Sequence, residues 1–297
     1  MPTIVSGSEY LSLPRAKETW LIKPVLPTSG AVLLYGDPKV GKSFAALQLA
    51  EAVASPSVKE WFGFPVTEKG KVVYVQLDTP RSLWTERLED MSREGFDVSS
   101  IHFADKETLD CFPFDILRPD HFDLLHTSLK EINPAVVIMD TLKESNSEKE
   151  NDATSQQKVM ASLVHAVYPA ALVVVSHARK PGEEGAHDII NDNRGSSYLT
   201  GRMDSILRFS KKTMYFVGRA LESGSVRMGR SSTGMWIPDN SPDKKDLDEL
   251  ATQLINDPTY PTVLQKAVEF SVRTGKSREA SRTFIRNRLP IDYQQEG

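Results

Sequence analysis

Between residues 30 and 176, short apolar runs alternate with longer stretches in which apolar residues recur at a helical period. The short runs lie at 31–35, 71–77, 100–103, 135–140 and 171–176, and they are rich in valine. Strands that are buried on both faces of a sheet have this composition. The pattern therefore predicts parallel strands in the interior of a sheet.

The stretches between these runs predict helices. Two of them place their apolar residues on one helical face. These faces consist of Phe122, Leu125, Leu129 and Ile132, and of Val159, Leu163, Val164 and Val167. Because strands and helices alternate along the chain, we expect an α/β fold with a mostly parallel sheet covered on both faces.

The pattern changes after residue 203. Apolar runs at 204–210, 213–219 and 225–230 follow one another with short turns, which predicts consecutive strands that form an antiparallel extension of the sheet. The polar stretch 237–246 contains two prolines and is typical of a linker. We therefore expect a core domain over residues 1–240 and a small domain over residues 241–297.

The small domain has room for three helices. The first is marked by Leu247, Leu250, Ala251, Leu254 and Ile255. Pro261 opens the second helix, and Leu264, Ala267 and Val268 form its predicted inward face. Ser277 is the expected cap of the third.

The small domain is also basic. Residues 261–290 contain seven lysines and arginines against two glutamates, whereas the whole chain has a net charge of −4. A glycine turn, a serine cap and arginines on the following helix resemble the second half of a helix-turn-helix. This element would bind the backbone of single-stranded or duplex DNA. A solvated basic face that packs against the core or a partner is the alternative.

Composition restricts the class of protein. With 39% hydrophobic and 26% charged residues, the chain has the makeup of an ordinary globular protein. Its longest apolar runs are too short to cross a bilayer, and its first ten residues lack a secretion signal. The single cysteine, Cys111, suits a reducing compartment and is expected to be a packing thiol. We expect a cytoplasmic protein without membrane contact.

Residues 36–43 read GDPKVGKS and fit the phosphate-loop pattern G-x-x-x-x-G-K-[ST]. The glycines allow the backbone to turn N–H groups toward an anion, and the following helix adds its positive end. Lys42 is expected to reach the β- and γ-phosphates, and the Ser43 hydroxyl is expected to ligate Mg²⁺. The predicted ATP-binding residues are Gly36, Asp37, Pro38, Lys39, Val40, Gly41, Lys42, Ser43 and Phe44.

Polar residues follow three of the predicted strands. Asp140 ends an apolar strand and is the expected second anchor for Mg²⁺. Asp78 ends another and could orient the attacking water, or simply cap the next helix. His177 stands at a third strand end, where it could sense the γ-phosphate or be a plain solvated histidine.

Taken together, these segments resemble the RecA-like P-loop ATPases and, within them, the RepA-type and DnaB-type replicative helicases. The resemblance covers roughly residues 20–236. It rests on the segments WLIKPVLPTSGAVLLYGDPKVGKS, VVYVQLD, VVIMDTL, VVVSHARKPG, RGSSYLTGRMDSILRF and YFVGR, which occur in the order of that family. Only the first segment is specific by itself.

The resemblance implies ATP bound between the subunits of a ring, usually a hexamer, with single-stranded DNA through its centre. It places Asp78 at the position of the catalytic glutamate and His177 at that of the phosphate sensor. Arg219 falls where the family supplies an arginine finger to the neighbour's ATP, with Arg194 and Arg202 as weaker candidates. A surface charge that closes a strand is the alternative for Arg219.

The chain departs from this family in two respects. Asp78 is one methylene shorter than the usual glutamate. The segments 143–157 and 178–195, which should line the pore, contain five basic residues against eight acidic ones and no aromatic residue. Loops that grip phosphates and bases are expected to be basic and aromatic. An ATPase is therefore better supported than a processive helicase.

Two functions remain open. The first is an oligomeric ATPase that moves on or remodels DNA in replication, recombination or repair. The second is a nucleotide-switched DNA-binding protein or helicase loader with weak hydrolysis. A metabolic kinase fits poorly, because the YFVGR segment and the antiparallel strands belong to the ring-forming branch.

Overall fold

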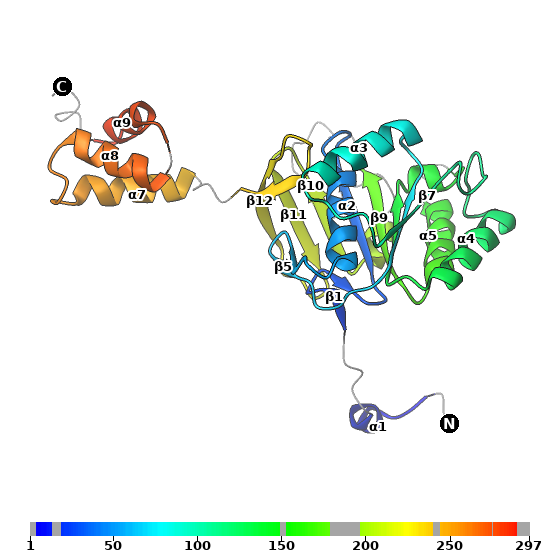
Figure 1. Ribbon diagram of the computed structural model, residues 1–297. Coiled ribbons are helices and arrows are strands. Elements are labelled where there is room, and N and C mark those ends of the chain that lie inside the picture. The colour runs from blue at the N-terminus through cyan, green and yellow to red at the C-terminus, as the bar shows by residue number, and fades with distance from the viewer. Residues whose placement is uncertain are drawn as a thin grey trace. The chain divides into compact units, whose positions relative to one another are not determined.

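A nine-stranded sheet forms the centre of the larger part of the chain (Figure 1). The computed structural model describes residues 4–13, 19–148, 153–178, 197–239, 244–274 and 276–289. The chain divides into two units, residues 1–238 and 239–297.

Six strands of the sheet run parallel. They are β3 (Ala31–Gly36), β6 (Val72–Gln76), β7 (Ile101–Asp105), β8 (Val136–Asp140), β9 (Ala171–His177) and β10 (Ser205–Phe209). Three antiparallel strands, β11 (Thr213–Gly218), β12 (Gly224–Arg230) and β13 (Trp236–Pro238), complete the order β13-β12-β11-β10-β3-β9-β8-β6-β7. Two small hairpins pair β1 (Trp20–Ile22) with β2 (Leu26–Pro27) and β4 (Glu60–Trp61) with β5 (Phe64–Pro65).

Helices cover both faces of this sheet, as the alternation along the chain predicts. One face carries α2 (Lys42–Ala54) and α3 (Arg81–Arg93), and the other carries α4 (Pro119–Ile132), α5 (Ala153–Val167) and α6 (Ser197–Arg202). Alternate residues of each parallel strand enter opposite cores. In β3, for example, Val32 and Leu34 pack in the first core, whereas Leu33 and Tyr35 pack in the second. The RecA-like α/β fold expected from the sequence is confirmed.

The consecutive strands expected after residue 203 are present, and β10, β11 and β12 pair antiparallel with one another. The expectation is wrong at one point: β10 joins the core as a parallel strand, because it runs parallel to β3 with Ser205 opposite Val32. The expected linker 237–246 is shorter than predicted, since β13 extends to Pro238 and a helix begins at Lys244.

The remaining elements of the first unit are short. A helix, α1 (Gly7–Ser12), begins with a capping box in which Ser6 and Glu9 bond each other's backbone N–H. A 3₁₀ turn, η1 (Lys143–Ser145), follows β8. Cys111 is buried, and burial raises the pKa of its thiol, in keeping with a packing role. No helix in the described part of the chain has the length and apolarity needed to cross a membrane.

The second unit contains α7 (Lys244–Asn256), α8 (Val263–Thr274) and α9 (Arg278–Arg286). As predicted, Ser277 caps α9 by accepting a hydrogen bond from Ala280 N at 3.2 Å. Pro261 lies before the helix that it was expected to open, because α8 begins at Val263. Leu264 does not face inward and is 60% exposed.

Side chains from α8 and from the residues after α9 pack against α7 and hold the three helices together. The buried Lys266 ammonium donates to the last carbonyls of α7, at 2.7 Å from Leu254 O and 2.9 Å from Ile255 O. Arg288 pairs with Asp248 of α7 and lies over the ring of Phe284. The arginines at 278, 282 and 286 of α9 are exposed.

Candidate functional site

The phosphate loop joins β3 to α2, as the motif predicts. Lys39 and Gly41 have positive φ angles of 63° and 91°, and Gly41 is the N-cap residue of α2. A Cβ on Gly41 would lie 1.5 Å from Nη2 of Arg230. Glycine is therefore required at position 41 both by its backbone angle and by the side chain beside it.

Lys42 is the first residue of α2, and its side chain is buried. Its ammonium group donates to Gly36 O at 3.0 Å and to Asp37 O at 2.9 Å, and it lies 3.3 Å from Nδ1 of His177. The positive charge is thus held at the start of the loop, next to the end of β9. A phosphate cradled by the loop N–H groups needs a counter-charge of this kind.

Asp140 ends β8 and is 3% exposed. Its Oδ2 accepts a hydrogen bond from the Tyr74 hydroxyl at 2.6 Å, whereas its buried Oδ1 has no hydrogen-bond partner among the described residues. Burial raises the pKa of Asp140, and the hydrogen bonds from Tyr74 and Ser43 oppose that rise. A buried oxygen without a partner is costly, and a cation beside it would remove that cost.

These residues fit magnesium–ATP. Ser43 and Asp140 supply the oxygen ligands that Mg²⁺ prefers, and the partnerless Oδ1 of Asp140 is available to it. Lys42 and the N-terminus of α2 suit the triphosphate. When bound, the metal would neutralise charge on the phosphate oxygens.

The register of the parallel strands brings His177 and Asp78 to the same edge of the sheet. His177 pairs with Gly36 across β9 and β3. Asp78 lies two residues beyond the end of β6, is exposed, and is near enough for its charge to raise the pKa of Asp140. Asp78 does not cap α3, because the N-cap of that helix is Pro80.

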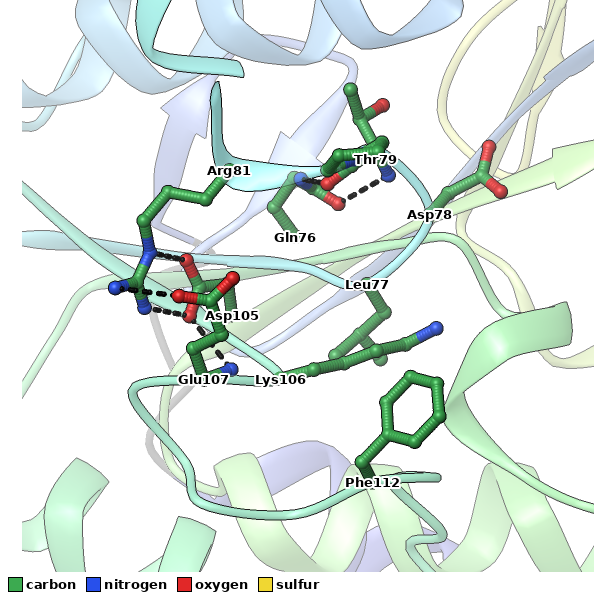
Figure 2. A pocket seen from close by; sticks show the side chains of 10 residues that line it. Gln76, Leu77, Asp78, Thr79, Arg81, Asp105, Lys106, Glu107 and Phe112 are labelled. Carbon is green, nitrogen blue, oxygen red and sulfur yellow. Dashed lines mark hydrogen bonds and ion pairs between the residues drawn. The ribbon is translucent and has the colours of Figure 1, made fainter. Parts of the chain in front are cut away.

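A cavity of about 330 Å³ lies beside Asp78, at the carboxyl ends of β6 and β7. Figure 2 shows the Asp78 side chain pointing away from the ion pairs on the opposite side of this cavity. There Arg81 bonds Asp105 at 2.6 and 2.7 Å and Glu107 at 2.9 Å, and the hydrogen bonds from Arg81 lower the pKa of Asp105 to about 2. Phe112 on the far wall is 83% exposed.

Arg219 lies far from the phosphate loop of its own chain. It follows Gly218, which pairs with Ser205, and Ser205 in turn pairs with Val32 near the start of β3. The loop leaves the other end of β3, about 15 Å away at roughly 3.3 Å per residue. Arg219 is 64% exposed and bonds Asp204 at 3.3 Å and Gly201 O at 3.1 Å.

Two residues that the sequence did not predict also contact the phosphate loop. Arg230, at the end of β12, donates to Val40 O, and Trp236, at the start of β13, donates from Nε1 to Gly41 O at 2.9 Å. The ring of Phe44, a predicted ATP-binding residue, has the guanidinium groups of Arg87 and Arg230 at 4.9 and 5.7 Å. No local motif marks Arg230, because only the order of strands in the sheet brings it to this edge.

Arg194 and most of the expected pore segment 178–195 lie outside the described residues, as do residues 149–152 of the segment 143–157. Arg202 ends α6 and is exposed.

Comparison with known proteins agrees with this geometry. An AAA domain family matches residues 5–183, more than half of the chain. The chain belongs to that family. The AAA domain carries the RecA-like P-loop ATPase core, and the matched range includes the phosphate loop, Asp78, Asp140 and His177.

Among solved structures, the AAA chain is similar to a KaiC-like protein of the hyperthermophilic archaeon Pyrococcus horikoshii OT3. That likeness has 14% identity and a TM-score of 0.46, and it covers 76% of this chain and 99% of the other. No curated protein matches the sequence.

Proposed function

We propose that this AAA chain is an oligomeric ATPase that acts on DNA, with each ATP bound between two subunits. The observation that carries this proposal is the separation of Arg219 from Lys42. Arg219 is exposed and stands about 15 Å along β3 from the loop of its own chain, so it can meet a γ-phosphate only in another subunit. An arginine supplied in this way stabilises transition-state charge.

The residues at the loop have distinct roles in this proposal. Lys42 and the N-terminus of α2 bind the phosphates, and Ser43 and Asp140 hold Mg²⁺. Asp78, which is exposed at the end of its strand, orients the attacking water as the general base. His177, whose Nδ1 lies 3.3 Å from the Lys42 ammonium, senses the γ-phosphate.

The basic face of α9 is the proposed DNA contact. Its arginines at 278, 282 and 286 are spaced four residues apart and exposed, which places three cations along one helical face. Such a row binds phosphates without reading sequence. In its more specific form, the proposal is a helicase or translocase of the RepA and DnaB type that acts in replication, recombination or repair.

A second function is favoured by one observation, the short and exposed side chain of Asp78. A carboxylate one methylene shorter than glutamate reaches less far toward a water, so hydrolysis would be slow. The chain would then be a nucleotide-switched DNA-binding protein or a helicase loader.

Steady-state ATP hydrolysis, measured with and without single-stranded DNA, tests the proposal and separates the two functions. An ATPase that moves on DNA predicts that single-stranded DNA strongly stimulates hydrolysis and that Lys42→Ala abolishes it. It also predicts that combined Arg278→Ala, Arg282→Ala and Arg286→Ala substitutions leave basal hydrolysis intact but reduce stimulation, because phosphate contacts are lost. Arg93→Ala, which removes an exposed arginine of α3, is the control.

Slow hydrolysis that DNA does not change would favour the switch. Equal stimulation of the wild-type chain and the triple arginine variant would exclude α9 as the DNA contact.

A further inference from the structure

Two side chains from the last strands hold the phosphate loop from outside the nucleotide site. Arg230 donates from Nη2 to Val40 O and from Nη1 to Gly234 O. Trp236 donates from Nε1 to Gly41 O at 2.9 Å. The Arg230 guanidinium also lies 3.6 Å from the ring centroid of Trp236, so the two side chains form one unit.

The carbonyls that they bind decide where the loop N–H groups point. The peptide bonds after Val40 and Gly41 are trans, so each carbonyl is directed opposite to the N–H of the next residue. Arg230 binds Val40 O from the side of β12 and therefore turns the N–H of Gly41 to the other side. Gly41 O already accepts the first hydrogen bond of α2, from Ala45 N at 3.2 Å, and Trp236 adds a second donor that holds this peptide unit, and with it the N–H of Lys42, in place. Both N–H groups belong to the N-terminus of α2, where N–H groups lack intrahelical partners and bind anions.

The contact is built into the fold. Trp236 is 1% exposed, and its backbone exchanges two hydrogen bonds with the Gln48 side chain of α2, at 2.8 and 2.9 Å. Only a glycine at position 41 leaves space for the Arg230 guanidinium. Partial burial lowers the pKa of Arg230 to about 10, which leaves the side chain charged at neutral pH.

We propose that Arg230 and Trp236 are positioning residues for ATP binding, because they fix the two peptide units whose N–H groups face the phosphates. The proposal rests on ATP use by the phosphate loop and not on DNA binding. It connects the antiparallel end of the sheet to nucleotide affinity through the backbone of the phosphate loop.

Nucleotide affinity of the full chain tests the proposal, measured by calorimetry with a non-hydrolysable ATP analogue and Mg²⁺ in the absence of DNA. Trp236→Phe keeps a ring but removes the side-chain donor to Gly41 O, which leaves only the Ala45 N–H on that carbonyl, and we expect its Kd to rise about 3- to 10-fold. Arg230→Met keeps a long side chain but loses both carbonyl contacts, and we expect a rise of roughly 10- to 100-fold. Arg230→Lys, which keeps the charge, should fall between wild type and Arg230→Met.

Two matched controls separate positioning from packing. Trp61→Phe also removes an indole donor to a carbonyl of α2, Ala45 O at 3.3 Å, but this carbonyl is beyond the loop. Arg227→Met alters an arginine on the same strand as Arg230, with no contact to the loop in the described structure. Both controls should bind the analogue like the wild type, even where thermal unfolding shows that they are less stable.

Tryptophan fluorescence gives an independent signal. Nucleotide binding is expected to change the surroundings of Trp236, so the emission change on adding the analogue should be smaller in Trp236→Phe than in Trp61→Phe. Trp84, which packs against Tyr74, contributes equally in both variants. Equal Kd values for wild type, Trp236→Phe and Arg230→Met would overturn the proposal. Failure of the wild-type chain to bind the analogue would overturn both this proposal and the proposed ATPase function. Normal binding without any response to DNA would overturn only the DNA role.

Discussion

At the scale of single residues, the Tyr74–Asp140 pair determines how the site tolerates a buried carboxylate. One oxygen of Asp140 accepts from the Tyr74 hydroxyl, and the other has no partner among the described residues. The Tyr74 ring packs against Trp84 and Phe103, at centroid distances of 5.2 and 6.0 Å. The hydroxyl can therefore be removed while the packing of the ring is kept.

Tyr74→Phe should destabilise the metal-free protein by about 1–3 kcal/mol, because it removes the hydroxyl donor from Oδ2 of a buried carboxylate whose Oδ1 already has no partner among the described residues. Urea unfolding measures this free energy. Magnesium–ATP should restore part of the loss, since the cation satisfies the same carboxylate. Tyr168→Phe is the control, because Tyr168 is 70% exposed and its substitution should change the stability little. A Tyr74→Phe protein as stable as this control would contradict the role given to the hydroxyl.

The residues of the site differ in how far sequence could predict them. Lys42 and Ser43 are fixed by motif spacing, and Asp140 is fixed by its place after a buried strand. Tyr74 lies in the interior of an apolar run, where nothing local distinguishes a packing tyrosine from one that bonds a carboxylate. Its role depends on the pairing of β6 with β8, which places Tyr74 and Asp140 on adjacent strands.

At the scale of elements, the turn between β12 and β13 is held by α3 as well as by the phosphate loop. Glu94, directly after α3, accepts hydrogen bonds from the hydroxyls of Ser232 and Thr233 at 2.6 and 2.7 Å. These bonds lower the pKa of Glu94 from 4.5 to about 2. One carboxylate thus ties the end of a helix to the turn that precedes Trp236.

Glu94 should contribute to stability in a pH-dependent way. Its folded pKa is below the unfolded value, so its contribution is complete above about pH 4.5 and is lost as the pH falls toward about 2. Glu94→Gln should therefore lower the melting temperature at pH 7 and differ less and less from wild type as the solution is acidified. Glu89→Gln, an exposed glutamate of α3, should give no such convergence. A constant gap between wild type and Glu94→Gln across the acid range would contradict this assignment.

The direction of a strand is a property that local pattern does not contain. The run at 204–210 alternates in the same way whether it pairs parallel or antiparallel, and its short turn to the next strand predicts an antiparallel extension of the sheet. In the structure its other neighbour is β3, about 170 residues earlier, and that pairing is parallel. Because β10 pairs with β3, the strands that follow place Arg230 beside the phosphate loop and Arg219 at the opposite edge of the sheet. Sequence reasoning could therefore predict the parallel core but not which arginine of the final strands lies near the nucleotide.

At the scale of the whole molecule, the position of Arg219 makes a prediction about assembly. A chain with Lys42→Ala cannot bind phosphate in its own loop but still carries Arg219. On the proposed role of Arg219, a chain with Arg219→Ala has an intact loop but does not complete a neighbour's site. Each variant alone should be inactive or nearly so in ATP hydrolysis, since an arginine finger contributes about 10³–10⁵ in rate.

Mixing the two inactive variants should restore activity. Where the loop of an Arg219→Ala subunit meets the arginine of a Lys42→Ala subunit, the site is complete. In an equal mixture that assembles at random, about a quarter of the interfaces meet this condition in a head-to-tail ring or filament. Hydrolysis should therefore recover to roughly that fraction of the wild-type rate. A double variant carrying both substitutions, mixed with wild type, is the control for subunit exchange. If the mixture of single variants stays inactive while the control shows that subunits exchange, Arg219 does not act in a neighbouring site, and each AAA domain must complete its ATP site with another group.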